Sequence, residues 1–508
     1  MNFVPNTNLR LLKGVPLDKE YQNTIMFPNA TTQQNYFNSK LVQSFDDFTY
    51  QRLQKYCVVG VNAEQLYNVN YMMFQNTNFG NKWFYAFVTD IAYLSQTSTA
   101  ITFEIDVFQT WLFDYKLMSC YVEREHVSND SIGTHIEDEG IGYGDYITYS
   151  RVDNEDTGIS DCNFVVASTR SITDPSVEDT SGGIYDGVFN GVKYYAYSSA
   201  SDLKKALSNF KDYTDSITAI FMAPKMLSPF EAGSHLVRES GAYNRGSFFG
   251  SRPLNFGGYV PKNNKLYTYP YTVMNVINNN GGGMALRYEL FKDPTSCEII
   301  IEGVLNKGTC LICFPNNYKG ITDNREYQLT LPPYANCEWV NDVYSTWLTQ
   351  NTSNIGLTTL GATGAVAYGA LTGNLLAVGG GLATAMNTLA NMDKQDKIPN
   401  EIRGGQGGNY MLTGARKNRF ELYNQTITAQ YARMIDDYFT MFGYRVARVK
   451  VPSTKSRKYW NYVKTSNAIV TGNIPTDSKD IIQNCLNKGI TFWHDTDVGN
   501  YNRTNPIL

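Results

Sequence analysis

The sequence predicts a mainly β protein with a few short helices and one long hydrophobic loop rich in Gly and Ala. Aromatic residues make up 14% of the 508 residues, including 37 Tyr and 26 Phe, and such side chains favour strands. Several runs alternate apolar and polar residues, which is the period of a half-buried strand. The loop is indicated by the stretch from Val343 to Met392, which contains no charged residue although 18% of the chain is charged.

The first third of the chain is expected to consist of strands. The clearest alternation lies in Thr99–Phe108, where every second residue is apolar. One face of this strand is expected to carry Ile101, Phe103, Ile105 and Val107, and the other Thr102, Glu104 and Asp106. The other expected strands in this part are Tyr56–Val61, Lys82–Ile91 after a Gly80-Asn81 turn, and strands within Tyr115–Arg124.

The middle of the chain is richer in loops. Residues 128–190 are acidic and rich in Gly, Asp and Ser, which predicts long loops at His135–Gly140 and Asp174–Gly183 around a strand at Asn163–Thr169. A short amphipathic helix is expected over Ser201–Lys211 and an aromatic loop from Gly241 onward. Cys297–Phe314 is expected to form two strands around a Lys307-Gly308 turn.

Two helices are expected near the C-terminus. The first spans about Thr426 to Phe442, with Gly443 as its C-cap, and the second spans Ser478 to Lys488, closed by Gly489. The apolar residues expected in the first are Ile427, Tyr431, Met434, Ile435, Tyr438 and Phe442.

Composition and motifs exclude several classes of function. The net charge of −4 and the pI near 5.7 do not indicate a nucleic-acid-binding surface. No secretory signal precedes the first strand, and the eight scattered cysteines are expected to be reduced core thiols. The four histidines show no metal-ligand spacing, and the lone Cys310-x-x-Cys313 lacks the second pair of a zinc site. Without a nucleophile or phosphate-binding motif, the sequence predicts neither an enzyme nor a cofactor.

One segment has a local excess of positive charge. Between Tyr438 and Thr476 the only charged residues are basic: Arg445, Arg448, Lys450, Lys455, Arg457, Lys458 and Lys464. Such a run is compatible with contact to a phosphate backbone, with a solvated face, or with a seam that pairs with acidic loops of a neighbouring subunit.

The uncharged stretch allows two interpretations. It is either a flexible low-complexity linker or a segment that meets a membrane, since Leu357 to Ala385 is long enough to span one. Its Gly and Thr content makes it a poor permanent span. Small residues recur at every fourth position, a spacing that lets helices pack closely in lipid. These residues are Gly361, Ala365, Gly369, Gly373, Ala377, Gly381 and Ala385.

Several runs resemble the tail knob, or distal tail tube, protein of small-genome short-tailed phages of Gram-positive bacteria. The most specific is YMMFQNTNFGNKWFYAFVTD at residues 71–90. The others are FNSK at 37–40, FEIDVFQTW at 103–111, REH at 124–126, WNYV at 460–463 and GITFWHDTD at 489–497. They lie on both sides of the uncharged stretch, so the resemblance covers most of the chain.

The resemblance implies a structural protein of the virion tail tip, made in the host cytoplasm, whose β-barrel or sandwich domains form a homohexameric tube. DNA passes through this tube without sequence-specific binding. One hydrophobic loop per subunit, about residues 351–408 here, plugs the tube and later enters the host cytoplasmic membrane as a channel. The expected partners are other copies of the chain, the upper tail or collar protein, the membrane lipids and the genomic DNA.

The resemblance also assigns roles within this loop. The residues expected to insert into the membrane are Leu357, Leu360, Val366, Leu371, Leu375, Leu376, Val378, Leu382 and Leu389. Those expected to pack the loop or act as hinges are Gly361, Ala365, Gly369, Gly373, Ala377, Gly381, Gly404, Gly405, Gly407 and Gly408. An alternative function is adsorption, with the acidic loops of residues 128–190 binding cell-wall polymer.

The expected division of the chain has five parts. A β-rich tube domain at 1–125 is followed by an inserted β domain at 126–290 with acidic and aromatic loops. A β tube segment at 291–350 leads into the hydrophobic loop at 351–408. An α+β segment at 409–508 completes the tube.

Overall fold

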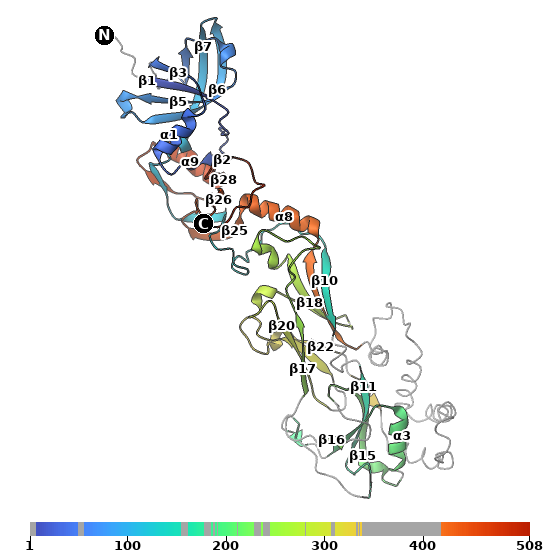
Figure 1. Cartoon of the computed structure of the whole chain (residues 1–508). Coiled ribbons are helices and arrows are strands. Elements are labelled where there is room, and N and C mark those ends of the chain that lie inside the picture. The colour runs from blue at the N-terminus through green and yellow to red at the C-terminus, as the bar shows by residue number, and fades with distance from the viewer. Residues whose placement is uncertain are drawn as a thin grey trace. The chain divides into compact units, whose positions relative to one another are not determined.

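The computed structural model describes most of the chain outside the hydrophobic stretch (Figure 1). The described residues are 7–48, 55–153, 161–176, 184–185, 188–189, 192–210, 212–227, 235–236, 244–279, 281–305, 310–331, 334, 336–337 and 418–508. They form two compact units, the first comprising residues 1–144, 259–266 and 429–508, and the second 145–258 and 267–428. The predicted mainly β class is confirmed, whereas the five-part division stays a prediction.

Unit 1 contains a six-stranded antiparallel sheet built from the N-terminal residues. In spatial order its strands are β3 (Leu41–Phe48), β1 (Thr7–Lys13), β5 (Val69–Asn76), β6 (Trp83–Ser95), β7 (Ser98–Ile105) and β4 (Tyr56–Val59). Side chains of these strands form a buried cluster together with Leu66, which lies just before β5. This cluster contains Leu9, Leu11, Cys57, Val59, Leu66, Val69, Met72, Phe74, Ala86, Ile101 and Phe103.

The prediction for Thr99–Phe108 was right for the strand and wrong for its end. Alternation holds through Ile105, after which Asp106 turns the chain into helix α2 (Val107–Thr110). Asp106 is buried rather than exposed because its carboxylate caps this helix by accepting from the Gln109 N–H at 3.1 Å, and it also accepts from the Tyr71 hydroxyl at 2.8 Å.

A second sheet of unit 1 joins the two ends of the chain. In spatial order its strands are β2 (Asn23–Ile25), β28 (Ile490–Trp493), β26 (Trp460–Ser466), β9 (Cys120–Glu125) and β25 (Tyr444–Lys450). Strands β2 and β28 run parallel, and all the other neighbouring pairs are antiparallel. A separate ribbon pairs β8 (Tyr115–Leu117) with β27 (Val470–Gly472).

Three longer helices belong to unit 1. They are α1 (Ala30–Asn38), α8 (Ala429–Phe442) and α9 (Thr476–Lys488). The predicted start of α8 at Thr426 was wrong, because Thr426 and Ile427 belong to strand β24. Gly443 is confirmed as its C-cap: its φ is +65°, its N–H donates to the Phe439 carbonyl at 2.8 Å, and a Cβ there would collide with the backbone of Glu125.

Unit 2 consists of small sheets around one large core. The first sheet has the order β10 (Tyr146–Asp153), β24 (Phe420–Ile427), β18 (Thr272–Asn278), β19 (Gly283–Leu286). The second has the order β16 (His235–Leu236), β14 (Lys193–Tyr197), β11 (Cys162–Ser168), β15 (Ile217–Pro224), β23 (Asn336–Cys337). The third has the order β17 (Asn244–Gly250), β20 (Cys297–Gly303), β21 (Leu311–Pro315), β22 (Leu329–Thr330), and β12 (Ile184–Tyr185) pairs with β13 (Val188–Phe189).

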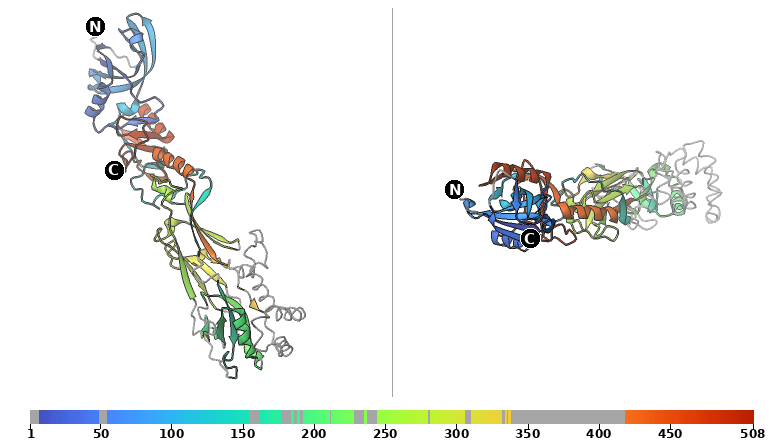
Figure 2. Two further views of the ribbon diagram at one scale, coloured as in Figure 1. Left: turned by 45° about the vertical axis from the view of Figure 1, so that its right-hand side comes forward. Right: turned by 90° about the horizontal axis from the view of Figure 1, so that it is seen from above.

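Unit 2 confirms some predicted elements and corrects others. Figure 2 shows β10 beside β24, although their register partners are 268 to 281 positions apart in the sequence, as for Asp153 with Glu421 and Tyr146 with Ile427. The predicted helix is observed as α3 (Ala200–Ser208). The predicted aromatic loop is wrong for Asn244–Gly250, because those residues form β17 against β20. Single 3₁₀ turns lie at Ala63–Gln65, Thr77–Phe79, Thr214–Ser216, Asn264–Tyr267, Tyr288–Leu290 and Arg325–Tyr327.

Candidate functional surfaces

The predicted hydrophobic loop lies outside the described residues. Every residue assigned above to membrane insertion, loop packing or hinges falls between Leu357 and Gly408, within the undescribed stretch 338–417. Their roles therefore stay predictions. No helix in the described part of the chain has the length and apolar character needed to cross a bilayer.

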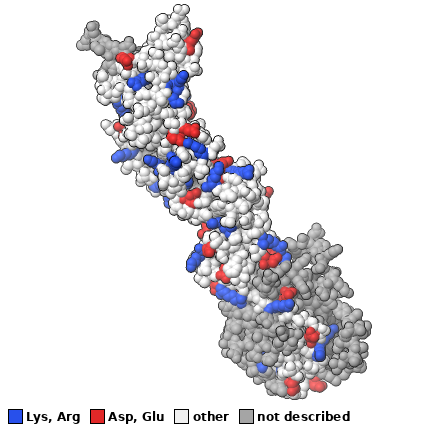
Figure 3. All heavy atoms as spheres, in the orientation of Figure 1, with Lys and Arg blue, Asp and Glu red and all other residues white. Residues whose placement is uncertain are grey.

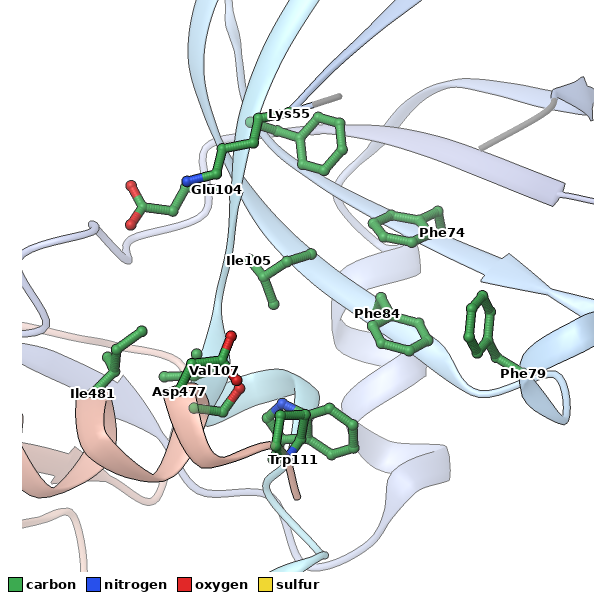
Figure 4. A pocket seen from close by; sticks show the side chains of 13 residues that line it. Lys55, Phe74, Phe79, Phe84, Glu104, Ile105, Val107, Trp111, Asp477 and Ile481 are labelled. Carbon is green, nitrogen blue, oxygen red and sulfur yellow. The ribbon is translucent and has the colours of Figure 1, made fainter. Parts of the chain in front are cut away.

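An aromatic groove in unit 1 is the first surface feature with the character of a binding site. It has a volume of about 490 Å³ and lies where the six-stranded sheet approaches α2 and the start of α9 (Figure 4). We define the aromatic groove by its lining residues: Lys55, Phe74, Phe79, Phe84, Phe103, Glu104, Ile105, Val107, Trp111, Pro475, Asp477, Ser478 and Ile481.

Ring packing holds the aromatic side chains of the groove in place. Phe84 is central, because its ring stacks on Phe74 at 5.4 Å and meets the edges of Phe79 at 5.8 Å and Trp111 at 6.1 Å. The Lys82 Nζ lies 3.8 Å from the centre of the Trp111 ring, and the same ammonium group forms an ion pair with Asp114. The groove thus presents a preformed apolar wall.

The opposite wall of the groove is polar and acidic. It is formed by the first two turns of α9, where Asp477 and Ile481 are exposed. Asp477 lies in the first turn, where the positive end of the helix dipole favours a negative charge. Glu104 adds a second exposed carboxylate from the end of β7, and Lys55 is the cation among the lining residues (Figure 4). Such a groove suits a partner with an apolar projection and a positive charge.

A second feature of unit 1 is an exposed apolar patch around β25. Tyr121 on β9 is the register partner of Val449 on β25, and the Met118 N–H donates to the Ile469 carbonyl at 2.9 Å. Val451 follows directly after β25. We call these exposed side chains the apolar patch: Met118, Tyr121, Val449, Val451 and Ile469. Arg448 is the register partner of the buried Val122, so it lies on the opposite face of this sheet from Tyr121 and Val449.

Most basic residues of the run between Tyr438 and Thr476 have partners within the described chain or are buried. Lys450 pairs with Glu125, Lys464 pairs with Glu123 at 2.9 Å, and Arg457 is buried. Arg445 donates to the carbonyl of Asp138 at 3.0 Å. Within the described part of the chain, Arg448, Lys455 and Lys458 form no ion pair. The run is therefore no continuous basic surface, and Figure 3 shows both signs of charge interspersed on the visible face.

The first acidic loop is held inside unit 1 by buried ionic contacts. Glu139 has a side chain only 1% exposed, and its carboxylate contacts both Arg124 and Lys265. It also accepts from the Arg445 N–H at 2.9 Å, while Asp130 accepts from the Tyr444 hydroxyl at 2.6 Å. Burial lowers the pKa of Lys265, while the nearby Glu139 carboxylate opposes this shift. Because Glu139 and Asp130 already have partners within unit 1, these two carboxylates are not free to recruit a ligand.

Helix α8 is attached to residues 259–263 by a buried aspartate. Asp436 accepts from the Tyr259 hydroxyl at 2.6 Å and from the N–H groups of Lys262 at 2.7 Å and Asn263 at 3.0 Å. The core face of α8 therefore includes this carboxylate beside Ile435 and Phe439, whereas Tyr431 and Met434, both expected in the apolar stripe, are exposed.

His126 is buried in its neutral form. Its Nδ1 accepts from the Tyr462 N–H at 2.7 Å, so Nε2 carries the proton and donates to the Thr440 carbonyl at 3.1 Å. Burial and the nearby arginines lower its pKa to about 3, while burial raises the pKa of Asp106 to about 6. Both groups have structural partners only, so neither indicates acid–base chemistry.

The remaining candidate ligands are also dispersed. Among the described residues no three His, Cys, Asp or Glu side chains gather as metal ligands, and the cysteines described are free thiols. Cys310 is exposed and Cys313 buried, as expected for positions three apart along a strand. Burial raises the pKa of the Cys57 thiol to about 12, which makes it inert.

The sequence did not predict the groove or the patch. Phe84 and Trp111 lie in the runs that carried the resemblance, but Asp477 and Ile481 come from more than 350 residues away. The alternation that identified the strands shows which side chains share a face and not which distant helix approaches that face. For the patch, the available signal was Val449-Lys-Val451 beside Pro452, an apolar edge without an evident partner.

Comparison with known proteins identifies the family. The model of the C-terminal domain of tail knob protein gp9 of Bacillus phage phi29 matches residues 239–506, more than half of the chain. The model of the caudoviral major tail protein N-terminus matches residues 5–116, which include the six-stranded sheet.

Whole-chain comparisons agree with this result. The chain is 26% identical to tail knob protein gp9 of Bacillus phage PZA and 25% identical to that of phage phi29, with both chains covered completely in each case. Its fold is similar to that of the tail knob protein gp12 of bacteriophage C1, with a TM-score of 0.68 at 16% identity over 99% of this chain and 100% of the other. These relatives carry the name of a structural tail part and not of an enzyme. The chain therefore belongs to the phi29 gp9 family of tail knob proteins and is a component of a phage virion tail.

Proposed function

We propose that the chain forms a homohexameric tube at the tail tip that conducts genomic DNA, with residues 351–408 acting first as a plug and then as a membrane-active loop. The observation that carries this proposal is the uncharged stretch from Val343 to Met392 in a tail knob protein. A long Leu-, Val- and Ala-containing segment without charge needs shelter in water. Six copies inside a tube would shelter one another.

Release of the loops would expose this apolar sequence to lipid. Burial of apolar surface contributes about 25 cal/mol per Å², and the four-residue spacing from Gly361 to Ala385 favours close helix packing. One loop is a weak span, whereas six could surround a pore. The glycines from Gly404 to Gly408 would supply the backbone freedom for refolding.

The six-stranded sheet supports assembly into a ring. Its edge strands β3 and β4 have one unpaired side each in the described chain, and both edges carry exposed apolar residues such as Leu41 and Val58. Exposed edges of this kind favour pairing with another chain. The upper tail or collar protein would bind the assembled tube, and DNA would pass without base-specific contacts.

Adsorption to cell-wall polymer has less support. Of the acidic residues that suggested it, Asp130 and Glu139 are engaged inside unit 1.

Dye release from liposomes tests the proposed membrane activity. The intact protein and a variant lacking residues 351–408 are compared at neutral and mildly acidic pH, with dyes of graded size. We expect leakage from the intact protein alone, with a size cutoff that admits duplex DNA. Equal leakage from both would assign membrane activity to another part of the chain, and no leakage from either would leave the loop a plug or linker.

A further inference from the structure

We propose that one internal water molecule is bound in the core of unit 2, between the side chains of Thr272 and Thr426. These residues lie on β18 and β24, the two central strands of the first sheet of unit 2. They are direct register partners in an antiparallel pair, so their side chains project from the same face of the sheet. Such a site would belong to the fold of unit 2 and would exist whether or not the chain forms a tube.

Both threonine hydroxyls are buried without a partner. Thr272 and Thr426 are each 0% exposed, and in the described part of the chain neither Oγ1 atom has a hydrogen-bond partner. A hydroxyl that leaves water on folding costs free energy unless another group bonds to it. Two such hydroxyls at the same place in a core indicate that a small ligand bonds to both of them.

The spacing of the two hydroxyls suits one bridging water. The Cβ atoms of directly opposite residues in an antiparallel pair lie about 4.5 to 5.5 Å apart. The two hydroxyls do not bond to each other. Two hydrogen bonds of about 2.8 Å that meet at one water can span up to about 5.6 Å, which is enough to join them.

Asn424 supplies a third polar group at the same end of the core. It lies two residues before Thr426 on β24, so its side chain is on the same face. Its amide oxygen accepts from the Tyr288 hydroxyl at 2.7 Å, and its amide nitrogen donates to the Ser150 Oγ at 2.9 Å. An amide nitrogen has two N–H donors, so these two contacts leave one donor for a further partner. Two hydroxyls and this donor would give the water about three hydrogen bonds, the usual number for a buried water.

The local packing differs from that of the rest of the face. Further along the same strands the core side chains are large and apolar, as with Met274 and Leu422. At the polar end the side chains are short, and the neighbouring strand β10 has an irregular register between Thr148 and Ser150. A bulge of this kind bends its strand and leaves one residue outside the ladder. We assign to the water the space that the short side chains and the bulge leave.

Valine substitutions test the bridge, because valine keeps the shape of threonine without its hydroxyl. In the full-length protein, Thr426→Val should raise the equilibrium constant for local opening of β24 about tenfold, because the water loses one partner and the Thr272 hydroxyl is left poorly bonded. Thr272→Val should have a similar effect. Hydrogen exchange of the β24 amides measures this constant, and exchange of β11 in the other large sheet of unit 2 is the internal reference.

The double variant distinguishes a shared ligand from two separate contacts. With one bridging water, Thr272→Val combined with Thr426→Val should open β24 about tenfold more than wild type, because the second substitution removes a hydroxyl that is already poorly bonded. An effect of about a hundredfold, the product of the two single effects, would show that the hydroxyls bond to separate groups and would overturn the bridge. Reduced opening in either single variant would show that the hydroxyl has no partner at all, which would overturn it too.

Thr99→Val is the matched control for the loss of one threonine hydrogen bond. Thr99 is also 0% exposed, and its hydroxyl donates to the Val61 carbonyl at 2.6 Å. Its effect on the opening of β7 calibrates the single substitutions in unit 2.

A density map that shows ordered water locates the ligand directly. In the wild-type protein one peak should lie within about 3.2 Å of both Oγ1 atoms, and this peak should be lost in Thr426→Val. A wild-type map with ordered water elsewhere in the core of unit 2 but none at this place would refute the site.

Discussion

Replacement of His126 by Gln is expected to make unit 1 less sensitive to acid. The folded protein keeps this imidazole neutral until its pKa of about 3, whereas in the unfolded chain it takes up a proton near pH 6.5. Below pH 6.5 the unfolded state therefore binds one proton more. The free energy of unfolding loses about 1.4 kcal/mol per pH unit from this group until the pH reaches about 3.

Asp106 has the opposite effect over much of the same range. Its pKa is about 6 in the folded protein and about 3.9 when unfolded, so between these values the folded state binds the extra proton. This carboxyl group stabilises unit 1 as the pH falls from 6 to 4, by about the same 1.4 kcal/mol per unit. In the wild type the two contributions nearly cancel, and a simple pH profile would hide both.

The two variants separate these contributions. From pH 6 to pH 4, His126→Gln should gain about 3 kcal/mol of stability relative to wild type, and Asp106→Asn should lose a similar amount. Urea denaturation at several pH values, followed by hydrogen exchange in the peptide containing Tyr462, reports on unit 1. Parallel pH profiles for wild type and His126→Gln would show that the buried imidazole has an ordinary pKa, which would refute the reasoning.

Two further pairs of substitutions, each a test with its control, probe the packing of unit 1 and are measured as changes in the urea midpoint. Glu139→Gln should lower the free energy of unfolding by about 3 kcal/mol, because it leaves the buried Lys265 without its carboxylate. Asp437→Asn is the control, since this side chain is 65% exposed and its loss should change the free energy of unfolding little. Equal effects of the two substitutions would show that the buried pair contributes no more than the exposed one. Gly443→Ala should cost about 2 kcal/mol because a positive φ combines with a collision against the backbone of β9. Gly499→Ala, with positive φ but open space, should cost about 1 kcal/mol, and a larger loss there than at Gly443 would contradict the steric argument.

Local pattern predicted the elements well and their partners poorly. Alternation located β7, and Gly489 located the end of α9, because each signal depends on neighbours within a few residues. The end of β7 was missed because Asp106, placed by alternation on the polar face, caps α2 from inside the core. Sequence spacing does not distinguish a carboxylate in solvent from one that caps a helix.

Helix α8 shows that a helix sequence alone does not determine which of its faces is buried. Its sequence offers two apolar stripes, one with Tyr431 and Met434 and another with Ile435 and Phe439. Only the second is buried, together with Asp436, because the donors of residues 259–263 satisfy that carboxylate. The partners lie more than 170 residues away in the sequence, so no local signal indicated which stripe would face the core.

The position of the hydrophobic loop in the chain bears on how it can act. It lies between β23, which pairs with β15, and β24, which pairs with β10 and β18. Tyr334 and Asn418 are described residues on the two sides of the loop. Burial raises the pKa of Tyr334 well above its usual range, and the Asn418 side chain lies near enough to oppose this shift. The two ends of the loop are therefore close together. A segment whose ends meet can be shortened with little loop-closure cost, because that cost changes only slowly with length. Removal of residues 351–408 is therefore expected to leave the sheets of unit 2 paired, so that lost leakage in the liposome experiment would reflect the loop itself rather than unfolding.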